Sequence, residues 1–387
     1  MTATAQSDWV ELARSLRAEV EAAAEQAEAE RATPRHIVDR FRDAGLFRLA
    51  VPRYYGGEEL DTTTIACMAE ELARADGSIA WVFGNGGGGN GMLALFLPET
   101  GAERVFTDSH SVVIGSIIPR GRALPVKGGY RLTGRWPLMS GCKHATWMYG
   151  MCLVREGDGY MLGPSGNPEF FIMFFRAEDA TIVDTWDSLG LRGTASHDVE
   201  VHEVFVPEDL VIPWTNPPIQ CPTRFKGVGP TDAMGGIIGA QCLGIARGAI
   251  DAFVELAAGK RPVFGQDLLR DRGTVQAKVA RAEALVRSAR LFLFDTYRMR
   301  DEWALSGQRT EEQRALGQLS VVNAGDAAAE AVDLVYLAAG SSAVYRGSKL
   351  ERTFRDIHTL TQHAGASHLG YEQVGRHFLG LGLSPVR

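Results

Sequence analysis

The chain has 387 residues, of which 45% are apolar and 22% are charged, and its net charge is −7. This length is typical of a soluble enzyme with two or three domains. The negative charge and the lack of a polybasic tract argue against nucleic acid and anionic membranes as partners. No secretion signal begins the chain, and no stretch approaches the roughly 20 apolar residues of a membrane helix. We therefore expect a cytoplasmic protein.

Three segments with different patterns follow one another. Residues 9–103 carry apolar side chains at three- and four-residue spacing, which predicts helices. Residues 111–213 contain short β-rich runs between glycine-containing turns, which predict a small β-barrel or sandwich. Along residues 238–256 and 275–293 the helical spacing returns, as in a bundle. We predict a mainly α protein with a central β domain: an N-terminal helical domain (1–110), a middle β domain (111–215) and a C-terminal helical bundle (216–387).

The cysteines are odd in number and scattered, with no Cys-x-x-Cys pair and no nearby histidine at ligand spacing: Cys67, Cys142, Cys152, Cys221 and Cys242. We expect reduced and mostly buried thiols. Lys143 would lower the pKa of Cys142, but a reactive cysteine is the less favoured alternative.

Two further patterns suggest ligands that we do not predict. Residues 84–91 contain a literal Gly-x-Gly-x-x-Gly, but a dinucleotide fingerprint follows a strand and this run follows a predicted helix. His358, His363 and His368 are spaced five residues apart, which suits shared metal binding on one helix poorly, and no carboxylate pair completes a site. We expect no metal.

Motifs spread over nearly the whole chain resemble the acyl-CoA dehydrogenase family. Residues 41–47 and 51–57 look like its Gly-Leu and Val-Pro-x-x-Tyr-Gly-Gly signature, and residues 186–194 are similar to its Leu-Gly-x-Arg segment. Residues 261–265 look like its Arg-x-x-Phe-Gly loop. The resemblance implies that family's fold and a homotetramer in which this loop reaches a neighbour's flavin. It also implies flavin-binding residues: Arg261, Phe264, Gln276 and Gly340. Of these, Arg261 and Gln276 would favour FAD over FMN by reaching a diphosphate.

Two positions resemble a particular group within that fold. Many dehydrogenases carry a Tyr-Glu pair whose glutamate is the catalytic base, and here the pair reads His363-Ala364. Residues 134–141 end in Ser-Gly and place Ser140 where dehydrogenases have a threonine that hydrogen-bonds flavin N5; the same run adds Trp136 as a predicted flavin contact. Both features look like the two-component (group D) flavin-dependent monooxygenases, oxidoreductases that receive reduced flavin from a separate reductase.

The resemblance implies a hydroxylase that uses O2 through a flavin C4a-hydroperoxide. Its substrate would be an aromatic or heteroaromatic small molecule such as a phenol, an indole or a polyketide ring. Ser140 would hold flavin N5, and His363 would hydrogen-bond the peroxide or take the substrate proton. The substrate would lie in a pocket enlarged by glycines and lined by residues of one region: Trp81, Phe83, Asn85, Gly87 and Gly88.

Several alternatives stay open. The chain could be an acyl-CoA or related dehydrogenase with a displaced base; the matching position on the helix before Gly244 is Met234, and Asp232 is two residues away. It could be an N-oxygenase of an amine or amino sugar on the same fold. It could also be a non-catalytic subunit, in which His363 only ends a helix and Ser140 only caps a turn.

Overall fold

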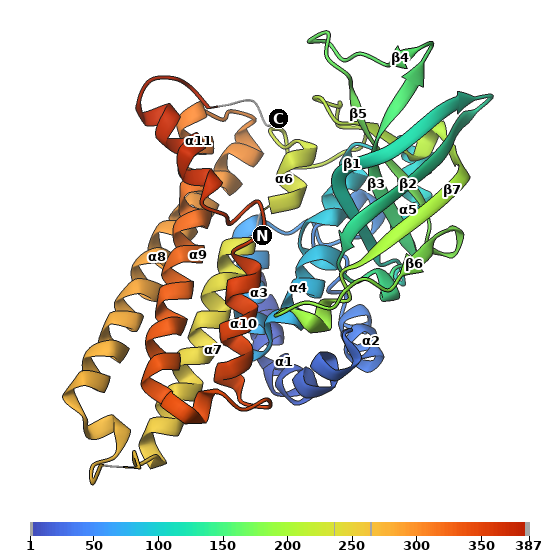
Figure 1. Ribbon diagram of the computed structural model, residues 1–387. Coiled ribbons are helices and arrows are strands. Elements are labelled where there is room, and N and C mark those ends of the chain that lie inside the picture. Colours follow the sequence, from blue (N-terminus) through green and yellow to red (C-terminus); the bar gives the residue numbers. More distant parts are fainter. Residues whose placement is uncertain (1–2, 236, 264, 384–387) are drawn as a thin grey trace.

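The computed structural model describes residues 3–235, 237–263 and 265–383. Figure 1 shows a helical N-terminal part, a β-sheet part and a long helical bundle, with the first part lying between the other two. The predicted fold class, mainly α with a central β region, is confirmed. None of the helices in this described part combines the length and apolar character needed to cross a bilayer.

The N-terminal part consists of α1 (Ala3–Glu30), α2 (Arg35–Asp43), α3 (Thr62–Ala75), α4 (Gly77–Phe83) and α5 (Glu99–Phe106). Aspartate caps begin two of these helices. Asp61 accepts a hydrogen bond from Thr64 N at 2.8 Å at the start of α3, and Asp76 accepts one from Ile79 N at 3.0 Å at the start of α4. Helix α4 continues directly into a π-helical turn over the glycine run, Gly84–Gly89. Such turns are frequent at functional sites.

The β part is built from β1 (Val113–Val126), β2 (Gly129–Met139), β3 (Trp147–Glu156), β4 (Gly159–Tyr160), β5 (Phe170–Arg176), β6 (Thr181–Val183), β7 (His197–Pro207) and β8 (Val211–Pro213). The expected barrel or sandwich is a single mixed sheet in the order β6-β7-β2-β1-β3-β5-β8, with β4 paired to β3. The β1–β3 pair is parallel and its register shifts between Ser116 and Gly121. Residues 117–120 thus lie outside the ladder.

The C-terminal part consists of α6 (Pro230–Gly235), α7 (Ile238–Gly259), α8 (Gly273–Ser306), α9 (Glu311–Ala339), α10 (Lys349–Leu360) and α11 (Leu369–Phe378). Helices α7 to α10 lie side by side as a bundle (Figure 1). The bundle meets the N-terminal part where α7 packs on α3. A Cβ at Gly244 or Gly248 would lie 2.4 Å from the backbone oxygen of Glu70 or Arg74. Only glycine permits this close approach.

The cysteines are free thiols, and all but Cys67 are buried. Burial raises the pKa of Cys142 to about 11, although Lys143 opposes the shift. The thiol also donates to Ala195 O at 3.2 Å. At neutral pH Cys142 is therefore protonated, which disfavours the reactive-cysteine alternative.

Candidate functional site

A cavity of about 320 Å³ lies where the three parts of the chain meet. Its walls come from α4 and the glycine run, from β1 to β3 with the segment before β7, and from the end of α10 and the residues after it. This volume lies at the lower end of the roughly 300 to 1,000 Å³ that small-molecule sites occupy.

A chain of hydrogen-bonded side chains forms one wall of the cavity. The indole N–H of Trp81 donates to Ser140 Oγ at 2.9 Å. Ser140 Oγ lies 2.7 Å from Ser196 Oγ, which lies 2.6 Å from Thr194 Oγ1. Thr194 Oγ1 donates to the backbone oxygen of Leu191 at 2.8 Å. The three hydroxyl groups are thus joined in a row that begins at the indole and ends at a carbonyl.

The backbone around this chain is held in an unusual conformation. Leu138, Leu191 and Ala195 have φ angles of 60°, 53° and 48°, in the left-handed region that residues with a Cβ rarely adopt. Each such residue costs on the order of 1 kcal/mol or more, and such strain is found preferentially at functional sites. The Gly141 N–H donates to Thr194 O at 2.8 Å, which ties the segment after β2 to the segment before β7.

Two buried carboxylates connect this wall to the helices. Asp356 on α10 accepts the Leu191 N–H at 2.6 Å. Asp76, which caps α4, lies 3.2 Å from the guanidinium of Arg352, also on α10. Burial raises the pKa of Asp76, and burial together with the Asp76 charge raises that of Asp356. The helices that carry Trp81 and lead to His363 are therefore joined to the Leu191 turn through one buried polar cluster.

His363 lies just after α10 and lines the same cavity. Its ring packs edge-on against Trp81, with 5.2 Å between the ring centroids. The Gly365 N–H donates to His363 Nδ1 at 3.1 Å, so the neutral ring carries its proton on Nε2. Desolvation by the surrounding protein lowers the pKa of His363, although the residue as a whole is exposed. Near neutral pH the imidazole is therefore uncharged and offers Nε2–H as a donor.

The sheet side of the cavity combines aromatic surface with backbone polar groups. Ile117 and Ile118 line it from the irregular stretch of β1, whose backbone groups do not pair in the ladder. The Tyr149 hydroxyl donates to Asn90 Oδ1 at 2.8 Å, and a Cβ at Gly115 would lie 2.3 Å from the Tyr149 ring. A flat ring that carries N–H and C=O groups, as a flavin does, fits such a surface.

Four of the residues predicted from the sequence as active-site residues line this cavity: Trp81, Asn85, Ser140 and His363. Three predicted substrate contacts lie outside its lining. Phe83 is fully buried and packs against Phe41, with ring centroids 6.2 Å apart. A Cβ at Gly87 would lie 2.0 Å from Leu46 O, and one at Gly88 would lie 2.5 Å from Ile237 Cδ1. These glycines allow the π-helical turn to pack closely against neighbouring chain segments, rather than enlarge the cavity.

Trp136, predicted as a flavin contact, belongs instead to the core of the sheet. It is fully buried, its indole N–H donates to Met151 O at 2.9 Å, and it stacks on Phe175. A Cβ at Gly121 or Gly150 would lie within 2.5 Å of its ring. The ring is thus enclosed by the protein's own atoms.

The residues predicted to bind the flavin diphosphate lie elsewhere. Arg261 lies in the turn between α7 and α8, Gln276 lies at the start of α8, and Gly340 follows α9. Figure 1 places the α7–α8 turn and the turn after α9 at the same end of the bundle. Lys260 joins the two turns by donating to Ala339 O at 2.6 Å. Helix α10, whose 12 residues span about 18 Å, leads from this end of the bundle to the cavity. Phe264 lies outside the described residues.

The carboxylate considered as a displaced base is already engaged. Asp232 pairs with Arg309 at 2.7 Å and accepts the Gly229 N–H at 2.8 Å. It does not line the cavity. Met234 lies on the same short helix α6, and its side chain is outside the described part of the structure.

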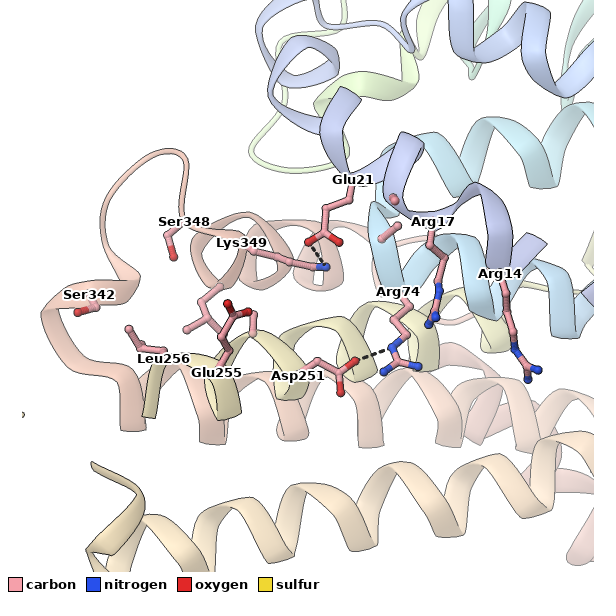
Figure 2. A pocket seen from close by; sticks show the side chains of 14 residues that line it. Arg14, Arg17, Glu21, Arg74, Asp251, Glu255, Leu256, Ser342, Ser348 and Lys349 are labelled. Atoms are coloured by element: carbon pink, nitrogen blue, oxygen red, sulfur yellow. Dashed lines mark hydrogen bonds and ion pairs between the residues drawn. The ribbon is translucent and has the colours of Figure 1, made fainter. Parts of the chain in front are cut away.

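A larger hollow of about 820 Å³ lies between α1, α3, α7 and the start of α10 (Figure 2). Its walls are charged, and most of these charges form ion pairs. Arg74 pairs with Asp251 at 2.5 Å, and Lys349 pairs with Glu21 at 2.7 Å. None of the residues predicted to act in catalysis lines this hollow. The smaller cavity is therefore the candidate active site.

Sequence reasoning did not select Thr194 and Ser196, although both line the cavity. Their position in the sequence could have indicated a role in the site. They stand at and just after the Leu-Gly-x-Arg segment, residues 186–194, which had been recognised as a motif. Their partner Ser140 is 56 residues from Ser196 in the chain, and the two meet because β2 and β7 are neighbours that pair Met139 with His197.

Comparison with known proteins identifies the family of the chain. The family model of the acyl-CoA dehydrogenase N-terminal domain matches residues 5–105, and that of the C-terminal domain matches residues 236–368. Indole-3-acetate monooxygenase of Pseudomonas putida is 33% identical over 353 residues, covering 89% of this chain and 87% of that protein. The flavin-dependent monooxygenase oxygenase subunit HsaA of Rhodococcus jostii is 30% identical over 354 residues, covering 88% and 90%. The solved structure of XiaF from Streptomyces sp., in complex with FADH2 and glycerol, has a TM-score of 0.88 and 25% identity, covering 100% of this chain and 98% of that chain.

Proposed function

The chain belongs to the acyl-CoA dehydrogenase family and, within it, to the two-component flavin-dependent monooxygenases, and we propose that its central cavity brings the flavin, O2 and the substrate together. The protein is the oxygenase component and depends on a separate flavin reductase. Reduced FAD, with FMN as the alternative, supplies O2 activation when it is bound. One observation supports the assignment of this cavity as the active site. Ser140 and His363 lie in it beside Trp81, and its described lining residues include no aspartate or glutamate.

Each wall of the cavity has a role in this proposal. Ser140 and backbone groups of residues 117–120, which lie outside the β1–β3 ladder, hydrogen-bond the flavin ring, and Trp81 holds the Ser140 hydroxyl in place. The Ile118 N–H does not take part, because it donates to Ser116 Oγ at 3.3 Å. His363 presents Nε2–H, which suits donating a hydrogen bond to the oxygen being transferred or to a substrate hydroxyl. Removing a substrate proton at Nε2 would first require His363 to give up its contact with the Gly365 N–H. We therefore favour the donor role.

The substrate is an aromatic or heteroaromatic small molecule. Trp81, Tyr149 and Trp186 supply ring surface to the cavity. An amine or amino sugar would enter as a cation, and the described lining offers it no carboxylate partner. Hydroxylation at carbon is thus favoured over N-oxygenation. The dehydrogenase alternative is disfavoured because Asp232 is held by Arg309 away from the cavity.

The protein assembles as a homotetramer in which one copy completes the flavin site of another. Arg261, Gln276 and Gly340 lie at the end of the bundle away from their own cavity, and Arg261 is exposed. The bundle also exposes large apolar side chains that a second copy would cover: Leu291 at 73%, Leu337 at 67% and Tyr345 at 70%. A diphosphate held by Arg261 of a neighbour would favour FAD over FMN.

The experiment that tests the function combines the purified protein with a flavin reductase, NADH, FAD or FMN, and a panel of phenols and indoles under isotopically labelled oxygen gas. We expect labelled hydroxylated product that requires both proteins. Catalase is added to remove free peroxide, and a reaction without the oxygenase serves as control. The proposal fails if the protein purifies with oxidised FAD, reduces a dye with acyl-CoA substrates and transfers no labelled oxygen.

A further inference from the structure

We propose that Ser196 and Thr194 fix the direction in which the Ser140 hydroxyl points its proton, and that the cavity thereby selects reduced over oxidised flavin. The inference rests on the proposed function, because it places the flavin ring against Ser140. Ser196 and Thr194 are positioning residues here. They act on the flavin through Ser140.

The direction of the hydroxyl chain follows from its last member. A carbonyl oxygen can only accept, so Thr194 Oγ1 gives its single proton to Leu191 O at 2.8 Å. Thr194 must then accept from Ser196 at 2.6 Å, and Ser196 must accept from Ser140 at 2.7 Å. The Ser140 proton therefore points along the cavity wall to Ser196 and is not available to a ligand. Its oxygen accepts from Trp81 Nε1 at 2.9 Å and keeps one lone pair for a ligand.

The structure holds the accepting end of the chain in place. Leu191 has a φ of 53°, and its N–H is bound to Asp356 at 2.6 Å. Its carbonyl also accepts the indole N–H of Trp186 at 3.1 Å. The three hydroxyl residues are buried, with Thr194 at 0%, Ser196 at 4% and Ser140 at 7% exposure, so bulk water does not replace a lost partner. Reversing the direction of the hydroxyl hydrogen bonds would remove the hydrogen bond from Thr194 to Leu191 O.

The two redox states of a flavin place opposite demands on Ser140. In reduced flavin the ring nitrogen N5 carries a hydrogen and donates, whereas in oxidised flavin the same nitrogen only accepts. The free lone pair of Ser140 matches the reduced form. In oxidised flavin, the lone pair of N5 would face the free lone pair of Ser140. This repulsion is relieved only if every hydroxyl in the hydrogen-bonded row reverses its direction. The cost of one neutral hydrogen bond corresponds to a preference of roughly five-fold in dissociation constant.

Anaerobic titration measures this preference directly as the ratio of the dissociation constants of oxidised and reduced FAD. Ser196→Ala leaves the Ser140 proton without its acceptor, and Thr194→Val lets Ser196 donate toward Ser140. Either change frees Ser140 to donate to oxidised flavin. We expect the ratio to fall by roughly five-fold in both variants, mainly through tighter binding of oxidised FAD.

The matched control is Ser320→Ala, because Ser320 belongs to another buried hydroxyl pair, 2.7 Å from Thr296 in the bundle. The ratio of the dissociation constants of oxidised and reduced FAD should be the same in Ser320→Ala as in the wild type. The two test variants alter different members of the chain, so either one that folds decides the outcome. An unchanged ratio in a variant that binds flavin overturns the inference and leaves the proposed function intact. A wild-type protein that binds neither form of FAD or FMN overturns both.

Discussion

Replacing Asp356 by asparagine would test whether the buried carboxylate pair makes stability depend on pH. Asp356 is 1% exposed and accepts the Leu191 N–H at 2.6 Å. Burial, and then the neighbouring Asp76, raise the pKa of Asp356 to about 7, whereas an unfolded aspartate titrates near ~3.9. Asparagine keeps the size and a carbonyl acceptor for Leu191, but it cannot ionise.

The expected sign follows from proton counting. Between about pH 4 and pH 7 the unfolded chain has released the Asp356 proton and the folded chain still holds it. The folded state then binds more protons, so the free energy of unfolding falls as pH rises, by at most ~1.4 kcal/mol per pH unit for one group. The guanidinium of Arg352 opposes the rise in the pKa of Asp356, and the pKa of about 7 already includes this effect. Between about pH 5 and pH 8, Asp356→Asn should gain on the order of 2 kcal/mol relative to wild type.

The assay is urea unfolding of both proteins at the two pH values and at one protein concentration, because assembly contributes to stability. Comparison with wild type at each pH removes the contributions that the two proteins share. Asp158→Asn, in the exposed turn between β3 and β4, is the control and should show no pH-dependent difference. If the difference between Asp356→Asn and wild type is the same at both pH values, the reasoning about the buried pair is refuted.

Three further predictions concern the cavity, the glycine turn and the flavin. His363→Ala should reduce hydroxylation by roughly 100-fold or more while changing the dissociation constant of reduced FAD by less than about three-fold. His110→Ala, at an exposed histidine outside the cavity lining, is its control, and equal losses of turnover and binding in His363→Ala would indicate a structural role. Gly87→Ala should lower the free energy of unfolding by about 1 to 3 kcal/mol, because its Cβ would lie 2.0 Å from a backbone oxygen. Gly375→Ala on α11, with nothing within 4 Å of its Cβ, should be neutral or stabilising, and similar values for both in urea unfolding would contradict the packing argument. Arg261→Glu should weaken binding of reduced FAD by roughly ten-fold and that of FMN much less; equal weakening in equilibrium titrations would show that Arg261 does not contact the diphosphate.

The helices were predictable from the sequence because their signals are local. Of the apolar residues spaced by three or four along 275–293, Val279 is half-buried and the others are buried in α8: Val275, Ala282, Val286, Ala289 and Leu293. Such three- and four-residue spacing places side chains on one face whatever the helix packs against. The motifs likewise led to Ser140 and His363, which both line the cavity.

The place of Trp136 could not be predicted in this way. Strand β2 shifts register between Leu132 and Gly134 and again between Trp136 and Met139. Each irregularity breaks the simple alternation of side chains between the two faces of a sheet, so sequence position no longer tells which face a residue occupies. The packing of Gly87 could not be predicted either, because its neighbour Leu46 comes from another segment of the N-terminal part.

The amino-acid sequence alone therefore established the order of helical, β and helical parts, the family resemblance, and the residue types at the two key positions. Folding was needed to show which side chains share the cavity and which way their protons point. Ser140, Ser196 and Trp81 come from three separate segments and are joined only by strand pairing and by the packing of α4 against the sheet. A hydrogen bond depends on distance and direction between atoms, and no spacing along the chain encodes either for residues so far apart.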